Sequence, residues 1–155
     1  MIIIGIDPGT DFTGVAVVGG DYSVYRAYKM PSADVEAFVR SEKPDAISCE
    51  SLSCYGVAVG REVFETAFWI GEYRCLCRQL GIPFHLFARP EYARALAGVG
   101  KVTDSVLRQT LLLRFGGDKK GQPLFPLKGS TDQRSAYAVA VYYLDKHHLT
   151  AVASR

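Results

Sequence analysis

The sequence has few of the residues that bind transition metals or build disulfide frameworks. Its 155 residues include three histidines and four cysteines, and no two cysteines have the Cys-x-x-Cys spacing of zinc sites. These counts argue against a structural zinc site and against a disulfide-stabilised fold. We expect a cytoplasmic protein, of a bacterium or of a phage-infected host, in which the cysteines are reduced and mostly serve as packing residues. They are Cys49, Cys54, Cys75 and Cys77.

Long hydrophobic runs and a strong net charge are also absent. No apolar run approaches the ~20 residues of a membrane span, and the opening Met1-Ile2-Ile3-Ile4 lacks the basic segment and cleavage site of a signal peptide. The composition, 48% hydrophobic and 22% charged, is typical of a globular protein, and the length suits one domain, residues 1–155. The net charge of +2 identifies no partner, although clustered basic residues can still bind nucleic acid. We expect no membrane association and no small-molecule cofactor.

Hydrophobic patterning predicts an α/β fold. Short β-branched runs separated by turn residues predict three strands joined by hairpins, at residues 2–8, 12–18 and 22–30. Further strands are predicted at residues 45–50 and 82–87. Helices are predicted from Pro31-Ser32 to before Pro44 and at residues 57–80, 90–97, 104–115 and 132–148, with a Gly- and Lys-rich loop at 116–131. This order indicates a mixed five-stranded sheet, an antiparallel three-strand meander plus two parallel strands, flanked by helices.

Two acidic residues stand where predicted apolar strands end. Asp7 directly precedes Pro8-Gly9, and Glu50 follows Ala46-Ile47-Ser48-Cys49. Each has a structural alternative, since Asp-Pro-Gly is ordinary turn chemistry and two surface carboxylates can be unrelated. In the predicted topology, however, the first and fourth strands are parallel neighbours, so their carboxyl ends lie side by side. Two carboxylates that converge repel unless a divalent cation holds them, which predicts a shared cation site.

A third acidic residue, Asp132, opens the last predicted helix. Capping and helix-dipole chemistry explain an aspartate there without any function. Its helical face nevertheless continues with residues that suit close packing on the sheet, so Asp132 is expected to reach the edge where Asp7 and Glu50 meet: Ala136, Val139, Ala140 and Tyr143. Three carboxylates without a histidine cluster favour Mg²⁺ or Mn²⁺. Such a set suits phosphodiester hydrolysis by two ions ~4 Å apart.

Several segments around these acids form a recognisable pattern. Ile4-Gly5-Ile6-Asp7-Pro8-Gly9-Thr10 is followed by Gly14-Val15-Ala16, and later by Gly98-Val99-Gly100-Lys101 and Asp132-Gln133-Arg134-Ser135-Ala136. Together with Glu50 they resemble, in order and over nearly the whole chain, the RuvC family of Holliday junction resolvases. The resemblance implies a ribonuclease-H-like fold and a homodimeric endonuclease that nicks opposing strands of a four-way junction. It also implies Asp7, Glu50 and Asp132 as catalytic residues with Mg²⁺ or Mn²⁺. The loop at 116–131 and the segment 60–66 suggest a phage-borne relative.

One position departs from the family's pattern. RuvC proteins commonly carry two metal-site residues three apart on the last helix, and here these positions hold Asp132 and Ser135. A hydroxyl is a weaker ligand than a carboxylate, so either Asp132 alone suffices, or a water fills the gap, or activity is low. Asp11 and Glu65 are alternative fourth acids, but turn and surface roles explain them better.

Basic residues gather late in the chain. Asp104, Asp118 and Asp132 are the only acids between residues 100 and 140. This asymmetry predicts a positive rim that contacts DNA phosphates around the site, although a solvated loop explains Lys119-Lys120 as well. The aromatic side chains of Tyr55 and Phe68 either stack on an opened base or, more simply, pack. The predicted DNA contacts are Arg61, Arg89, Lys101, Arg108, Lys119, Lys120, Lys128 and Arg134.

Helix 57–80 carries two apolar stripes. The stripe predicted to face the sheet consists of Val59, Val63, Ala67, Ile70, Arg74 and Cys77. A second stripe, rotated by about 100°, is predicted to form a twofold dimer contact: Phe64, Phe68, Gly71 and Cys75. Glycine inside a helix costs about 1 kcal/mol relative to alanine, which is tolerable where another helix approaches closely. The alternative is that residues 116–131 cover the phenylalanines within one chain.

Other functions are compatible with parts of this pattern. ATPases of the sugar-kinase, actin and heat-shock type also open with Gly-Ile-Asp-x-Gly-Thr, but they need a second lobe that 155 residues do not hold. A catalytically weak or inactive junction-binding protein has the same motifs, and so has a nuclease of this fold that acts on RNA or on other branched DNA. A divalent ion between the three acids would separate a nuclease from an inactive binder.

Overall fold

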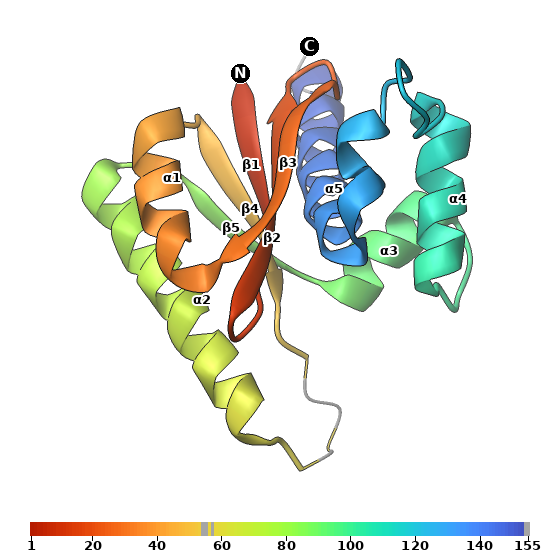
Figure 1. Ribbon diagram of the computed structural model, residues 1–155. Helices are drawn as coiled ribbons and strands as arrows, with labels where there is room; N and C mark the ends of the chain where they lie inside the picture. The colour runs from red at the N-terminus through yellow and green to blue at the C-terminus, as the bar shows by residue number, and fades with distance from the viewer. Residues whose placement is uncertain (54–55, 57, 154–155) are drawn as a thin grey trace.

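The computed structural model describes residues 1–53, 56 and 58–153, and it is built around one five-stranded sheet (Figure 1). The strands are β1 (Ile2–Asp7), β2 (Phe12–Gly19), β3 (Val24–Pro31), β4 (Ala46–Ser51) and β5 (Phe84–Ala88), in the order β3-β2-β1-β4-β5. β1, β2 and β3 pair antiparallel, whereas β4 pairs parallel with both β1 and β5. The predicted sheet, with its meander and its two parallel strands, is confirmed.

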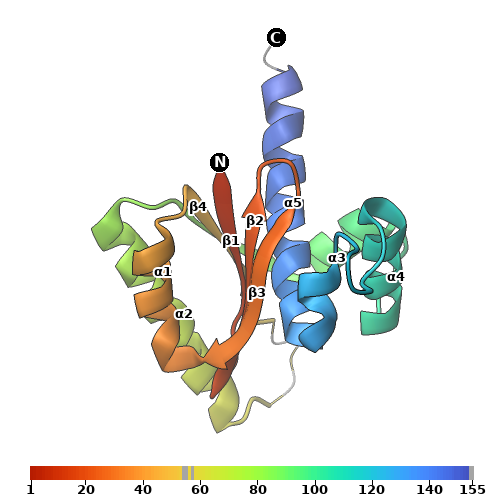
Figure 2. The ribbon, with the colours of Figure 1, turned by 45° about the horizontal axis from the view of Figure 1, so that its top comes forward.

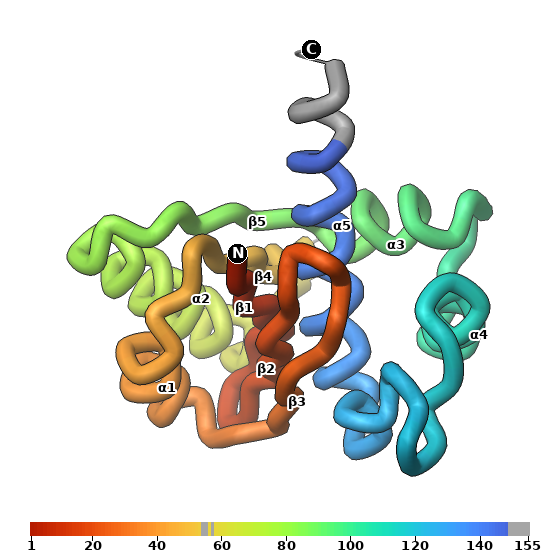
Figure 3. The backbone as a smooth tube through the Cα atoms, turned by 90° about the horizontal axis from the view of Figure 1, so that it is seen from above, coloured from red at the N-terminus to blue at the C-terminus, as the bar shows by residue number. Residues whose placement is uncertain are grey.

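Helices cover both faces of the sheet. On one face lie α1 (Val35–Glu42) and α2 (Arg61–Leu80), and on the other α5 (Thr131–Ala153), with α3 (Arg89–Ala97) and α4 (Asp104–Phe115) beside it (Figures 1 and 3). Two short 3-10 helices complete the chain, η1 (Ser32–Asp34) and η2 (Phe125–Gly129), and η2 lies in the segment predicted as a loop. The far end of α5 extends past the sheet (Figure 2). Among the described residues, no helix combines the length and hydrophobicity needed to cross a membrane.

The packing of α5 on the sheet depends on two strand glycines. A methyl group added at Gly5 would lie 1.8 Å from the carbonyl oxygen of Ala136, and one added at Gly14 would lie 2.4 Å from that of Asp132. The backbone of the helix therefore contacts the backbone of β1 and β2 directly. The alanines of α5 were predicted to permit close packing, but the strand glycines are the stricter requirement, and they fix the height at which Asp132 stands above the sheet.

Gly14→Ala is expected to lower the free energy of unfolding by about 1–3 kcal/mol or more, because the added methyl overpacks a backbone contact. Urea unfolding followed by circular dichroism measures this change. Gly100→Ala is the matched control, since a methyl group there meets nothing within 4 Å, and it should change stability little. Equal effects of the two substitutions would contradict the proposed contact.

The face that α2 turns toward the sheet differs from the prediction. Thr66, Tyr73, Leu76 and Cys77 are buried there, whereas three members of the predicted stripe, Val59, Ala67 and Arg74, are exposed. Polar anchors set the rotation of the helix. The indole nitrogen of Trp69 donates to the carbonyl oxygen of Thr10 (2.8 Å), and the hydroxyl of Tyr73 donates to the carbonyl oxygen of Ser32 (3.0 Å). Apolar periodicity takes no account of hydrogen-bonding side chains, so most of the predicted stripe was wrong. The exceptions are Ile70 and Cys77, which pack against the core, and Val63, which is partly buried.

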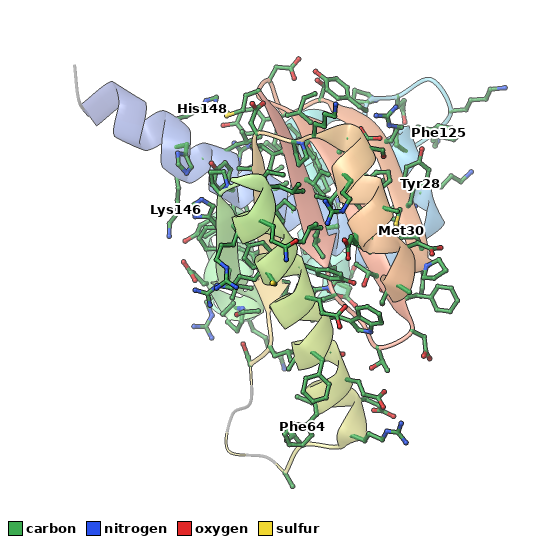
Figure 4. The ribbon with its side chains drawn as sticks, turned by 90° about the vertical axis from the view of Figure 1, so that its left-hand side faces the viewer. Tyr28, Met30, Phe64, Phe125, Lys146 and His148 are labelled. Atoms are coloured by element: carbon green, nitrogen blue, oxygen red, sulfur yellow. The ribbon has the colours of Figure 1, made fainter. Side chains whose placement is uncertain are left out.

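The second stripe of α2 is open to solvent. Phe64 is 56% exposed and Phe68 is 69% exposed, and Figure 4 shows Phe64 at the end of α2, clear of the sheet. Residues 116–131 lie on the opposite side of the sheet, beside α4 and α5 (Figure 1). The alternative that this segment covers the phenylalanines is therefore wrong. Of the cysteines, Cys49, Cys75 and Cys77 are free thiols, whereas Cys54, like Tyr55, lies outside the described residues.

Candidate active site

The carboxyl ends of β1 and β4 bring Asp7 and Glu50 to one edge of the sheet. The parallel register pairs Ile6 with Cys49, so the two acids follow at matching positions. Across the antiparallel pair, Asp7 stands opposite Gly14, the glycine on which the first turn of α5 rests. Asp132 therefore comes to the same place, and its charge and that of Glu50 both act on Asp7.

The surroundings of Asp7 disfavour the negative charge of its carboxylate. Burial, followed by the charges of Glu50 and Asp132, raises the pKa of its carboxyl from 3.8 to about 8. The nearby charge of Arg89 and a hydrogen bond from Ser135 act in the opposite direction but are outweighed. A carboxylate whose negative charge is so poorly compensated is a favourable ligand for a cation.

A buried hydrogen-bond network holds the turn that follows Asp7. The hydroxyls of Thr13 and Ser32 lie 2.9 Å apart, and those of Thr13 and Tyr73 lie 3.2 Å apart. Ser32 also donates to the carbonyl oxygen of Gly9 at 2.8 Å. Because these three side chains come from β2, η1 and α2, the position of Asp7 is tied to both helical and sheet elements on its side of the molecule.

Glu50 is bound by two residues of α3. The hydroxyl of Tyr92 donates to its Oε2 at 2.5 Å, and Nη1 of Arg89 lies 3.7 Å from the same oxygen. Burial raises the pKa of Glu50, while the hydrogen bond from Tyr92 and the charge of Arg89 lower it. Arg89 also donates to the hydroxyl of Ser135 (2.9 Å) and forms an ion pair with Asp104. The arginine predicted as a DNA contact thus lies among the acids.

Asp132 and Ser135 occupy the first turn of α5 on the same side. Asp132 is partly exposed and pairs with Nζ of Lys29 at 2.7 Å; the hydrogen bond with Asp132 raises the pKa of that lysine. Ser135 is buried and contacts Arg89, so it lines the site, as its place in the motif requires. Asp11 is exposed, and Glu65 pairs with Arg61 on α2.

The donor set fits a hard divalent ion. Within the described part of the chain, no three acidic, histidine or cysteine side chains are grouped closely enough to form a ready-made metal site. The carboxylates of Glu50 and Asp132 are instead drawn toward Arg89 and Lys29. Asp7, in contrast, has its negative charge poorly compensated. Asp7, Glu50 and Asp132 together offer the oxygen ligands that Mg²⁺ and Mn²⁺ prefer.

Some of the predicted DNA contacts gather beside the acids and others do not. Arg89 and Lys101 line a pocket of about 260 Å³ together with Arg94, which the sequence did not single out. Arg108 is neutralised by Asp118 at 2.6 Å, and Arg61 by Glu65. The remaining predicted contacts lie on the loop, on η2 and on α5, and they do not line this pocket: Lys119, Lys120, Lys128 and Arg134.

Sequence reasoning also missed Lys29, Tyr92 and Asp104. Lys29 had a usable signal, because the hairpin registers align Asp7, Gly14 and Lys29 across three strands. Tyr92 follows Arg89 by three residues on α3, so the two share a helical face. Asp104 is the first residue of α4, and its ion pair with Arg89 joins the start of α4 to the start of α3. No sequence pattern pointed to this contact.

The fold of the chain is similar to that of solved structures. Thermus thermophilus RuvC matches with a TM-score of 0.75 and 18% identity, over 97% of this chain and 97% of that one. The same protein in complex with a Holliday junction substrate matches with a TM-score of 0.77 and 17% identity, over 97% and 96% of the two chains. The chain has the RuvC fold. No family profile matches the sequence, so the likeness to RuvC is one of fold, and it spans both chains almost completely.

Proposed function

We propose that the protein is a divalent-metal-dependent endonuclease that cuts Holliday junctions or other branched DNA. The observation that carries this proposal is the convergence of Asp7, Glu50 and Asp132 at the carboxyl edge of a sheet with the RuvC fold. Binding of branched DNA is supported by the RuvC structure in complex with a Holliday junction substrate, which matches this chain over its length.

The three acids are proposed to hold Mg²⁺ or Mn²⁺. Such an ion, when bound, supplies an activated water and neutralises charge on the scissile phosphate. Tyr92 donates to Glu50 and Lys29 to Asp132, and each donor thereby orients the carboxylate that it contacts. Ser135 and Arg89 close the site beside Asp7 and Glu50. Hydrolysis then forms one bond from water oxygen to phosphorus and breaks the bond to the leaving sugar oxygen.

The pocket beside the acids is proposed to receive the DNA backbone. Arg94 and Lys101 face it without a carboxylate partner among the ion pairs of the described residues. Guanidinium and ammonium groups bind phosphate oxygens through charge-assisted hydrogen bonds. These two side chains are therefore stronger candidates for phosphate contacts than Arg108, whose charge is neutralised by Asp118.

A homodimer through α2 is part of the proposal. Phe64, Phe68 and Gly71 lie on one exposed stripe, and a methyl group added at Gly71 meets nothing within 4 Å, which leaves room for another helix. A twofold contact along this stripe would set it against its own copy. Two sites in one dimer would allow paired cuts in opposing strands.

Phe68→Glu is expected to convert a dimer into a folded monomer, because it introduces a charge into an apolar contact that a second copy must desolvate. Sedimentation at micromolar protein, with circular dichroism as a check on folding, measures the change. Leu113→Glu is the matched control, since Leu113 is an 81% exposed apolar residue of α4, away from the stripe. A wild-type chain that sediments as a monomer would refute the dimer.

A second candidate function is junction binding without cleavage. It is favoured by Ser135 at a position where the motif has a stronger ligand and by Arg89, whose guanidinium already contacts Glu50 and Ser135. Both functions require DNA binding, and only the first requires hydrolysis.

A panel of labelled substrates tests the proposed function and separates it from the second. The four-way junction, fork, duplex, single strand and RNA–DNA hybrid are each incubated with the protein in Mg²⁺ and in Mn²⁺, and binding is measured in Ca²⁺. We expect the junction, or another branched DNA, to be bound most tightly and to be cut. Binding without any cutting would indicate the second function, and preferential cutting of the hybrid would replace DNA with RNA as the substrate.

A further inference from the structure

We infer that Arg89 takes the place of one divalent ion, so that the site holds a single ion per chain, and this inference rests on the proposed function. The guanidinium lies inside the acid cluster and contacts both the Glu50 carboxylate and the hydroxyl of Ser135. Those are the two groups that a second ion would need as ligands on this side of the site.

The contacts of Arg89 fix its position. Nη1 lies 2.9 Å from the hydroxyl of Ser135, 3.2 Å from that of Tyr92 and 3.7 Å from Oε2 of Glu50. Nη2 pairs with Asp104 at the start of α4. Since Tyr92 also donates to Glu50, one face of that carboxylate is already engaged by α3. A guanidinium held by four partners from β4, α3, α4 and α5 is part of the site's architecture.

A serine and an arginine meet where the motif of the last helix has its second metal-site residue. Ser135 stands where the motif of the last helix has its second metal-site residue. A serine at that position carries no negative charge, and the guanidinium that contacts it carries a positive charge. Both features weaken the attraction for a second cation at this position.

The charge balance of the cluster also suits one ion. With Asp7 ionised, as a metal ligand must be, Asp7, Glu50, Asp104 and Asp132 carry four negative charges, while Arg89 and Lys29 carry two positive charges. The remaining two negative charges are neutralised by one divalent cation. A second such cation would leave an excess of two positive charges in a partly buried site, which is costly without further anionic ligands.

The chemistry of arginine suits the role of the metal ion that it is inferred to replace. A guanidinium is always charged and donates to phosphate oxygens in a fixed geometry. Beside a scissile phosphate, Arg89 would stabilise the negative charge that develops on the phosphoryl and leaving oxygens as the bond to phosphorus breaks. The reaction would then combine one ion with one arginine.

The number of bound ions tests this inference without reference to activity. The full-length chain is titrated with Mn²⁺ in the absence of DNA, and free Mn²⁺ is counted by electron paramagnetic resonance. We expect one ion per chain for the wild type and for Arg89→Lys, which keeps the charge. Arg40→Gln is the matched control and should also bind one, since Arg40 pairs with Glu36 on α1, away from the acids. The double variant Arg89→Gln/Ser135→Asp should bind two.

Two ions per wild-type chain would overturn the inference, and so would a folded double variant that still binds one. The wild-type count decides the matter even if the double variant fails to fold, which circular dichroism reveals. One ion together with no cleavage of any nucleic acid would refute the proposed nuclease and leave the ion count intact. No bound ion at all would refute both.

Discussion

Asp7→Asn is expected to lower the rate of junction cleavage in Mg²⁺ by on the order of a thousandfold or more, the effect of disabling a central group in a catalytic site. Asp7 is the residue on which the charges of Glu50 and Asp132 both act. An amide in its place has nearly the same shape but no negative charge to hold a cation. The fold should persist, because the substitution removes an unfavourable charge.

Glu50→Gln and Asp132→Asn should each also lower the rate of junction cleavage strongly. Junction binding should survive in all three variants, or tighten at low metal concentration, because each removes a negative charge that faces DNA phosphates. Cleavage rates and gel-shift affinities measured on the same junction separate the two effects. Asp118→Asn is the matched control, since Asp118 pairs with Arg108 away from the three acids, and it should keep cleaving. Substantial residual cleavage by Asp7→Asn would contradict the assignment.

The metal-free protein is expected to lose stability as the pH rises from about 4 to about 8. The pKa of Asp7 lies near 8 in the folded protein instead of 3.8, and the pKa of Glu50 is raised as well. Between these values the folded state retains a proton that the unfolded state has released, so a rising pH favours unfolding. The slope for one such proton is at most about 1.4 kcal/mol per pH unit.

Urea unfolding of the wild type and of Asp7→Asn at several pH values, in EDTA and in Mg²⁺, measures this effect. Subtracting the free energies of unfolding of the two proteins at each pH cancels the contribution of the titratable groups that they share. In EDTA, Asp7→Asn should become the more stable protein as the pH rises, by on the order of 2 kcal/mol at pH 8. Mg²⁺ should restore the wild type, since ligand binding to the folded state stabilises it. A difference that does not vary with pH would refute the raised pKa of Asp7.

The predictable part of the site follows from local patterns. Asp7 and Glu50 end apolar strands, and side-chain alternation together with the order of strands is enough to place them side by side. Asp132 follows from the periodicity of α5. These inferences need only the sequence around each residue and one topological rule, that parallel neighbours end at the same edge.

The rest of the site depends on contacts between segments far apart in the chain. Arg89 meets Ser135 and Asp104 through the docking of α3 between β4, α4 and α5, and no local pattern encodes that docking. The rotation of α2 was missed for a related reason: Trp69 and Tyr73 turn inward to hydrogen-bond backbone carbonyls, whereas hydrophobic periodicity counts only their apolar character. Lys29 was within reach, because the hairpin register aligns it with Asp7.

Cleavage of a four-way junction with different labels on its opposing strands tests most directly whether Asp7, Glu50 and Asp132 form a metal-dependent nuclease site. The wild-type protein and Asp7→Asn are each incubated with the junction in Mg²⁺, in Mn²⁺ and in EDTA. We predict that the wild type nicks both opposing strands when a divalent ion is present, and that EDTA and Asp7→Asn each abolish the nicks. A junction that is bound but left uncut in both metals, or that is cut equally well by Asp7→Asn, would contradict the proposed function.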